Sequence, residues 1–231
     1  MNVNIRTVRY LLFFIACSFI ACHQGNFKPE FSNHKKEVYR QAMQNGDYEV
    51  ATQAIYDILA TQPSENAWRD SLALLYAQQK AYPQALKISE QQTAQNPNDT
   101  LMLKVQALAH KALGNPKKSL EVYEKLYPLT KNVYHLYEIA TIQYSMTRLQ
   151  ECLITAQSLH QHEGLGEARI HLNFNQQNQV VPLKAAVYNI QGVVAKDLDK
   201  QTEARTFFEQ ALKIAPDFAL AKGNLDELIF N

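Results

Sequence analysis

One cluster of side chains has a composition that could bind a metal ion. His160 and His162 lie close in the chain to Glu163, Glu167 and His171, and imidazole and carboxylate groups are common ligands of zinc. Recognisable zinc sites place their ligands at fixed spacings, such as His-Glu-x-x-His on one helix or paired cysteines, and this segment has neither. We interpret the histidines as solvent-exposed groups at the end of a helix, and we predict no metal site.

Two other features could support nucleotide binding or catalysis. Gly164-Leu165-Gly166 lacks the preceding strand and the further glycines of a phosphate-binding loop, so we interpret it as a turn. Cys152 lies in an apolar helical pattern, where a buried and unreactive thiol is expected rather than a nucleophile. No residue is a candidate for a general acid or base. The sequence therefore predicts a protein that is not an enzyme and has no cofactor.

The composition favours a helical, globular protein. Of 231 residues, 46% are hydrophobic and 19% charged, with only 7 glycines and 8 prolines, and Ala, Leu, Gln, Glu and Lys recur throughout. The formal net charge is +1, and basic residues gather only in pairs such as Lys35-Lys36 and Lys117-Lys118. A surface that tracks phosphates needs more concentrated charge, so we expect no nucleic-acid partner.

The amino-terminal residues have the pattern of an export signal. Arg6 and Arg9 precede an apolar run from Tyr10 to Ala21, which is shorter than the ~20 residues that span a bilayer. The run ends in Ser18-Phe19-Ile20-Ala21-Cys22, which resembles the lipobox of bacterial lipoproteins. This resemblance implies that residues 1–21 are a signal peptide and that Cys22 carries lipid. The alternatives are ordinary cleavage with a free Cys22, or an uncleaved anchor.

The segment after the signal contains Gly25, Pro29 and polar residues without periodicity. We therefore predict that residues 22–33 form a tether, whose reach is at most ~35 to 40 Å when extended.

Small residues and prolines repeat at a constant spacing along the rest of the chain. Ala51, Ala85 and Ser119 recur with a period of about 34 residues, which is the period of a helix-turn-helix repeat, and Pro63 and Pro97 have the same separation. Cys152 follows Ser119 one position short of a full period. The next small residue in the pattern, Ala204, comes roughly half a repeat later than the period predicts, which indicates an insertion between Cys152 and Ala204.

The clearest repeat contains Tyr188, Gly192, Ala195, Ala204, Phe208, Ala211 and Pro216, and an earlier one contains Trp68, Leu72, Ala73, Tyr76, Tyr82, Ala85 and Pro97. These positions resemble the pattern of the tetratricopeptide repeat family over about residues 34–230. The resemblance implies an all-α, right-handed superhelical solenoid of about five helix hairpins with a C-terminal capping helix. We assign repeats 1–4 to residues 34–163, and repeat 5 with the cap to residues 185–231.

A β-hairpin is predicted within the insertion, at residues 164–184. Ala168, Ile170, Leu172 and Phe174 alternate with Arg169, His171 and Asn173, and a turn at residues 175–178 separates them from Val180 and Val181. An isolated hairpin is marginal in water, so its apolar face should pack on the helices, with Pro182 at a strand end. The hairpin either staples neighbouring repeats together or offers a free edge to a partner strand.

In this family the first helix of each hairpin lines the concave face, where partners bind. The positions of this chain that fall there are Lys36, Arg40, Lys104, Lys111, Tyr134, Tyr137, Tyr144, Asn189 and Lys196, together with Asp70 and Leu74. They predict a groove of basic and tyrosine character.

The resemblance thus implies a non-enzymatic scaffold or adaptor of the bacterial cell envelope, anchored to a membrane through its N-terminal lipid and binding a protein or peptide partner. The alternative is a nutrient-uptake lipoprotein that binds a glycan or peptide.

Overall fold

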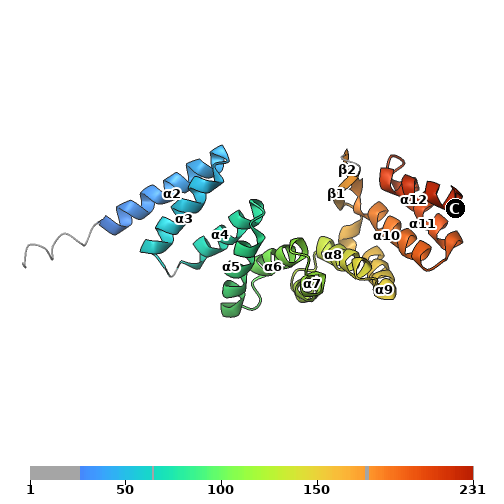
Figure 1. The fold of residues 1–231 in the computed structure, drawn as a ribbon, viewed down its shortest axis with the longest axis horizontal. Helices are drawn as coiled ribbons and strands as arrows, with labels where there is room; N and C mark the ends of the chain where they lie inside the picture. Colours follow the sequence, from blue (N-terminus) through green and yellow to red (C-terminus); the bar gives the residue numbers. More distant parts are fainter. Residues whose placement is uncertain (1–26, 64, 175–176, 231) are drawn as a thin grey trace, which may run out of the picture. The chain divides into compact units, whose positions relative to one another are not determined.

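The computed structural model describes residues 27–63, 65–174 and 177–230, and the chain divides after Lys80 into two compact units. The first unit contains helices α2 (Phe27–Asn45), α3 (Tyr48–Thr61) and α4 (Asn66–Gln78), of which α2 packs against α3 and α3 against α4 (Figure 1). The predicted second repeat, α4 with the next helix, lies on both sides of this division.

The second unit contains helical hairpins and one small sheet. Its elements are α5 (Tyr82–Gln95), α6 (Thr100–Ala112), α7 (Pro116–Thr130), α8 (Val133–Ser145), α9 (Leu149–His160), the 3₁₀ turn η1 (Glu163–Leu165), β1 (Arg169–Phe174), β2 (Gln177–Pro182), α10 (Leu183–Asp197), α11 (Gln201–Ile214) and α12 (Ala219–Phe230). Each helix packs against the next one along the chain, from α5 to α12. The all-α repeat fold, the inserted hairpin and the capping helix α12 are therefore confirmed.

The period of the sequence is visible in the backbone. The turn after the first helix of each hairpin contains one residue in the left-handed region, namely Gly46 (φ 71°), Lys80 (φ 60°), Gly114 (φ 73°), Thr147 (φ 59°) and Asp199 (φ 59°). These residues recur at the same intervals as the small residues of the sequence pattern, including the short step before Thr147 and the long one before Asp199. Three of the five turns thus place a residue with a Cβ atom where glycine is favoured.

The predicted small residues lie where two helices cross. Ala51, Ala85, Ser119, Cys152 and Ala204 all have 0% exposed area. The hydroxyl of Ser119 donates a hydrogen bond to the carbonyl of Ala107 over 2.8 Å, so burial leaves it satisfied. Close crossing at these positions explains why the pattern accepts only small side chains there.

Prolines follow three of the five second helices that the structure describes, each at the same distance. α3 ends at Thr61, α5 at Gln95 and α11 at Ile214, each two residues before Pro63, Pro97 and Pro216. A proline lacks the N–H that would continue the helix, and it disfavours helical backbone at the residue before it. The predicted role of these prolines as stop signals is confirmed.

The inserted hairpin packs on the helices through one face. β1 and β2 are antiparallel, with Ile170 opposite Val181, and burial alternates along β1 as predicted. Ile170 and Leu172 pack against the buried core of the second unit. β2 ends at Pro182, the strand end predicted for it. Residues 175 and 176 of the predicted turn lie outside the described residues.

Two polar links join the hairpin to its neighbours. The backbone N–H of Arg169 donates to the Tyr134 hydroxyl of α8 over 3.3 Å. The Gln179 side chain accepts from the N–H of Ala219 over 3.1 Å and donates to the carbonyl of Asp217. In Figure 1 the hairpin stands beside α10, with β1 toward α8 and β2 toward α12. The hairpin therefore links repeat 4 to the start of α12. Linking neighbouring parts of the array is one of the two roles predicted for it.

The predicted tether is wrong over its second half. Helix α2 begins at Phe27, and Ser32 is buried with its hydroxyl donating to Gln62 Oε1 over 3.1 Å. Pro29 suggested irregular backbone, but it lies in the first turn of α2, where a helix tolerates proline because that N–H has no intrahelical partner. Helix α2 thus begins before residue 34, where the first repeat was predicted to start.

Cys22 and the predicted signal peptide lie outside the described residues. Within the parts of the chain that are described, every helix is too short or too polar to span a membrane.

Candidate functional site

The first helices of the hairpins in the second unit share a stripe of equivalent positions along one helix face. Leu101, Lys104, Leu108 and Lys111 on α6 are spaced three or four residues apart, so they share one helix face. Tyr134, Tyr137, Thr141 and Tyr144 occupy the same positions on α8, and Asn189, Val193 and Lys196 occupy them on α10. We call the α6 and α8 parts of this stripe the first-helix surface.

Three apolar or aromatic side chains are exposed on the first-helix surface. Leu101 is 41% exposed, Leu108 40% and Tyr134 42%. Lys104 lies between the two leucines along the α6 stripe, is itself exposed, and forms no ion pair with any residue that the structure describes. This part of the surface combines apolar contact area with one available cation.

The two other lysines along the stripe form ion pairs with glutamates on the next helix of the stripe or on the capping helix. Lys111 Nζ on α6 pairs with Glu138 Oε2 on α8, and Lys196 Nζ on α10 lies 2.9 Å from Glu227 Oε2 on α12. These pairs link α6 to α8 and α10 to α12. The predicted basic groove is therefore corrected: in this unit, Lys104 is the predicted cation left without a carboxylate partner among the described residues.

Tyr144 is also engaged across repeats. Its hydroxyl donates to Asp197 Oδ2 on α10 over 3.0 Å, and burial, with this hydrogen bond and the Asp197 charge, raises the pKa of Tyr144 to about 12. The side chain is half-buried, so only part of its ring is available for contact.

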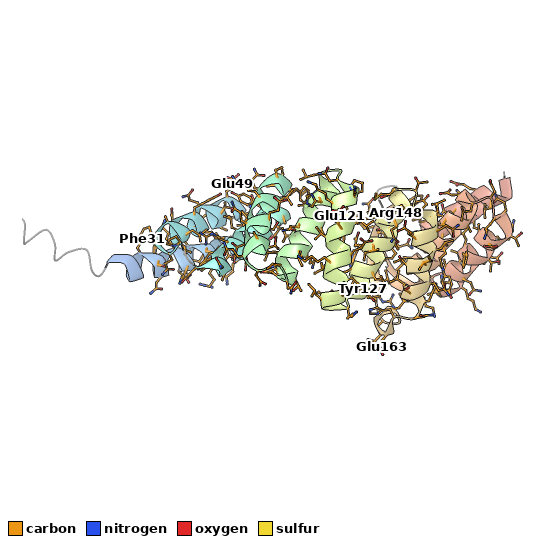
Figure 2. All side chains as sticks on the ribbon, turned by 90° about the horizontal axis from the view of Figure 1, so that it is seen from below. Phe31, Glu49, Glu121, Tyr127, Arg148 and Glu163 are labelled. Carbon is orange, nitrogen blue, oxygen red and sulfur yellow. The ribbon has the colours of Figure 1, made fainter. Side chains whose placement is uncertain are left out.

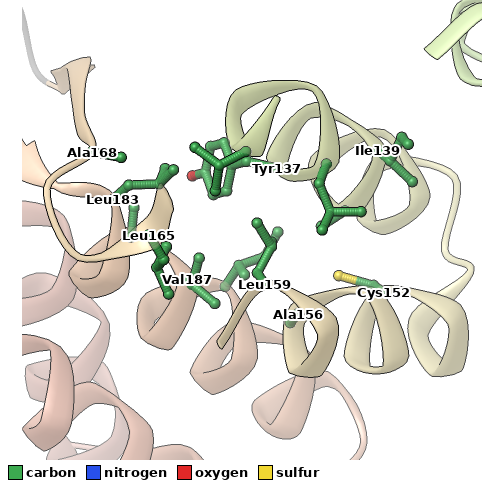
Figure 3. Close-up of a cluster of buried hydrophobic side chains, with 14 of the residues drawn as sticks. Tyr137, Ile139, Cys152, Ala156, Leu159, Leu165, Ala168, Leu183 and Val187 are labelled. Carbon is green, nitrogen blue, oxygen red and sulfur yellow. The ribbon is translucent and has the colours of Figure 1, made fainter. Parts of the chain in front are cut away.

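Two predicted contact residues are buried instead. Tyr137 is 8% exposed and lies in the core near Leu165 and Leu183 (Figure 3), where burial raises the pKa of its hydroxyl. Asn189 is 6% exposed, and its Oδ1 accepts a hydrogen bond from Asn224 Nδ2 over 2.9 Å. The structure thus corrects the predicted exposure of these two side chains: the inserted segment covers Tyr137 and the capping helix covers Asn189, whereas the equivalent Lys104 is exposed.

Lys36 and Arg40 belong to the first unit. Lys36 Nζ lies 4.0 Å from Glu65 Oε2 and 6.0 Å from the ring centre of Trp68. Arg40 forms a two-pronged ion pair with Glu37 on its own helix, with N–O distances of 2.6 and 2.9 Å. Whether these residues continue the first-helix surface of the second unit stays a prediction.

The histidine cluster contributes to packing. His160 Nε2 is 2.8 Å from Gln191 Oε1, and its ring lies 4.4 Å from that of Tyr188. His162 Nδ1 accepts from the N–H of Gly164 over 3.0 Å, and its Nε2 is 2.9 Å from the carbonyl oxygen of Lys131. The side chains of His160 and His162 are half-buried, which corrects the expectation of solvent-exposed groups for these two, whereas His171 on β1 is exposed.

The Tyr127 ring packs 6.3 Å from His162, and Figure 2 shows Tyr127 on the same side as Glu163. Among the described residues, no three His, Cys, Asp or Glu side chains converge on a point where they could hold a metal ion.

Cys152 is buried as predicted, and its burial raises the pKa of the thiol to about 12. A thiol with so high a pKa is almost entirely protonated near neutral pH, so it is a poor nucleophile.

Sequence reasoning missed Leu101 and Leu108. Leu108 lies one repeat period after Leu74, and Leu74 was assigned to the concave face. Applying the period to leucine as well as to lysine and tyrosine would have found it. Leu74 in the first unit is 40% exposed, the same fraction as Leu108.

Comparisons with known proteins agree with the repeat. A family profile described as "Tetratricopeptide repeat" matches residues 185–218, which contain most of α10 and all of α11. No curated protein matches the sequence.

Solved structures share the fold. MamA protein matches with a TM-score of 0.66 at 12% identity, over 83% of this chain and 95% of that one. MamA 41-end from Desulfovibrio magneticus RS-1 has a TM-score of 0.66 at 10% identity, over 82% and 97%. YrrB, described as a TPR protein with an unusual peptide-binding site, has a TM-score of 0.64 at 14% identity, over 80% and 87%. At these identities the likeness shows that the chain has the fold of tetratricopeptide repeat proteins.

Proposed function

We propose that this protein is a non-enzymatic interaction scaffold of the bacterial cell envelope, which binds a segment of a partner protein on the first-helix surface. The observation that carries the proposal is the exposure of Leu101, Leu108 and Tyr134 around the unpaired Lys104. Repeat proteins hold such side chains on a stacked scaffold, so little conformational entropy is lost when a partner binds.

The charges indicate what the partner segment contains. Because Lys111 and Lys196 are already paired with carboxylates, general electrostatic attraction is weak, and binding relies on apolar contact. Lys104 then selects for an acidic residue placed among the apolar side chains of the partner. The description of YrrB as a peptide-binding TPR protein supports this class of partner.

The envelope setting rests on the lipobox-like sequence at Cys22. If Cys22 carries lipid, only residues 23–26 separate it from the start of α2. Four residues span at most ~14 Å, so the scaffold would be held closer to the membrane than a tether of residues 22–33 implied.

The alternative of a glycan-binding uptake lipoprotein gains little support. Glycan sites usually present an open aromatic face, whereas Trp68 is half-buried and packs edge-to-face against Tyr39, with ring centres 5.2 Å apart.

Photocrosslinking in cells tests the proposal. A photoreactive amino acid at position 108 should capture a partner protein, because Leu108 is exposed on the first-helix surface. The matched control is Ile154, which is 66% exposed but lies on α9, a second helix. Equal capture from both positions, or capture from position 154 alone, would place the binding site elsewhere.

A further inference from the structure

The two edges of the hairpin can be told apart by the pairing of its backbone groups. The N–H of Leu183 donates to the carbonyl of Ala168 over 2.8 Å, which makes these residues a hydrogen-bonded pair. In an antiparallel ladder such pairs alternate with pairs whose N–H and C=O groups point outward. Arg169, His171 and Asn173 therefore point their backbone groups away from β2, and Asn178, Val180 and Pro182 point theirs away from β1.

The β2 edge is poorly suited to further pairing. Pro182 has no N–H to donate, and the Gln179 side chain bonds to the backbone of Asp217 and Ala219. The segment that leads into α12 therefore lies beside β2.

The β1 edge is open beyond its first residue. The N–H of Arg169 bonds to the Tyr134 hydroxyl, in agreement with its outward direction. For the outward N–H and C=O groups of His171 and Asn173 we find no partner within residues 27–63, 65–174 and 177–230. β1 contains no proline, although natural sheets often protect an edge with one.

We propose that the β1 edge binds an extended segment of the partner protein, which pairs with His171 and Asn173 as a third strand. The inference rests on the proposed function, because Tyr134 is at once part of the first-helix surface and the contact at the start of the β1 edge. A segment leaving the first-helix surface at Tyr134 reaches this edge directly.

The side chains of β1 define the chemistry of that segment. A residue opposite another on a neighbouring strand lies on the same face of the sheet. Residues that pair with Ile170 and Leu172 would extend the half-buried face that packs on the core, so they are apolar. Residues that pair with Arg169 and His171 lie on the exposed face, where acidic side chains complement the arginine. The occupant is thus a strand in which apolar and acidic residues alternate.

Energetic considerations agree with this assignment. A hairpin of two strands is marginal by itself, and a third strand adds backbone hydrogen bonds and a wider apolar face. Since packing on α10 and the links at Tyr134 and Gln179 already hold the hairpin in place, the partner does not have to order it.

The cross-strand pair Asn173 and Asn178 provides a matched experiment. Asn173 Nδ2 donates to Asn178 Oδ1 over 2.9 Å, so Asn173→Pro and Asn178→Pro each remove this bond and one outward N–H. They differ in the edge that they alter. The probe is a labelled peptide of about seven residues in which valine and glutamate alternate, the length of an ordinary strand. Fluorescence titration should show binding that Asn173→Pro weakens about tenfold and Asn178→Pro leaves unchanged.

Changes in the probe keep the test independent of the stability of the variants. N-methylation of alternate residues on its pairing edge should abolish binding to the unaltered protein, and a valine-lysine peptide should bind less tightly. If the probe fails to bind, if both proline variants behave alike, or if the valine-lysine peptide binds equally well, the inference is overturned. A dimer of the protein alone that Asn173→Pro abolishes would also overturn it, because the occupant would be a second copy.

Failure of this inference can be separated from failure of the proposed function. Leu108→Asp alters the first-helix surface without touching the hairpin. If the photocrosslinked partner loses affinity for Leu108→Asp but keeps it for Asn173→Pro, the edge inference is overturned while the proposed function stands. If neither change alters affinity, both are overturned.

Discussion

Gly192 on α10 lies so close to Phe208 on α11 that a Cβ atom at residue 192 would be 2.4 Å from Phe208 Cε1. Phe208 is fully buried, so a shift of its ring would disturb the side chains packed around it. The helices of repeat 5 therefore cross at a distance that only glycine permits, which explains the glycine in this part of the repeat pattern.

We predict that Gly192→Ala lowers the free energy of unfolding by about 3 kcal/mol through overpacking. Gly223→Ala on α12 is the control, because a Cβ atom there meets nothing within 4 Å, and it should be neutral or slightly stabilising. Chemical denaturation measures both. Equal stability of the two variants would show that the α10–α11 crossing is looser than described.

Substitutions at two of the left-handed turn residues should change stability in opposite directions. Thr147 has φ 59°, a conformation that costs an L-residue about 1 to 2 kcal/mol, most of all a β-branched one. Thr147→Gly should therefore raise the free energy of unfolding by up to about 1 kcal/mol, because glycine relieves this strain at some entropic cost. Gly114→Ala, at the equivalent turn with open space around it, should lower stability by about 1 kcal/mol. A thermal melt in which both variants shift in the same direction would contradict this explanation.

Much of the fold follows from the spacing of small residues, because close helix crossings tolerate few side chains and recur once per repeat. The hairpin was also predictable, since Ile170, Leu172 and Phe174 alternate with polar residues. The exposure of side chains on the first-helix surface was less accessible to prediction. Lys104 and Tyr137 occupy equivalent positions, and only the packing of the inserted segment shows that one is exposed and the other buried. Lys111 pairs with Glu138 on the first helix of the next repeat, a link that no local pattern indicates.

Stability should fall in mild acid because two histidines are buried. Burial lowers the pKa of His110 and of His135, with Lys118 adding to the effect at His110 and Lys104 at His135, while Glu90, Glu121 and Glu138 oppose it. Above pH ~6.5 these histidines are neutral in the folded and unfolded chain alike. Below it the unfolded chain binds protons that the folded one does not, so the free energy of unfolding decreases as pH falls.

Chemical denaturation at a series of pH values above and below ~6.5 measures how the free energy of unfolding changes with pH. His135→Gln should make the decrease in stability smaller, and Lys104→Glu should do so as well by placing a negative charge near His135. If the slope is the same in both variants as in the parent, His135 does not contribute to the acid sensitivity.

Cys22 is predicted to carry lipid after removal of residues 1–21. Cys22→Ala should move the protein from the membrane fraction to the soluble fraction, because a single cysteine provides the attachment point. Intact-mass measurement of the membrane-extracted parent should show a lipidated N-terminus at residue 22. A free thiol at that position would indicate ordinary cleavage, and a mass that retains residues 1–21 would indicate an uncleaved anchor.

Two tyrosines on α8 lie three residues apart, and substitutions at them should affect different properties: one the binding of the partner, the other the stability of the fold. Tyr134 is 42% exposed, so Tyr134→Ala should weaken the binding of the photocrosslinked partner by about 1 to 3 kcal/mol, with little change in the melting temperature of the protein. Tyr137 is 8% exposed in the core, so Tyr137→Ala should instead lower the free energy of unfolding by about 3 kcal/mol. Titration of the partner, combined with thermal melting, distinguishes these effects.

Tyr134→Phe then divides the contribution of the ring from that of the hydroxyl. It keeps the contact area of the first-helix surface but removes the acceptor for the N–H of Arg169. If apolar contact dominates, Tyr134→Phe binds almost as tightly as the parent, because the ring still faces the partner. A loss as large as that of Tyr134→Ala would mean that the hydroxyl matters through the position of β1, so that the partner depends on the hairpin more than on the exposed ring.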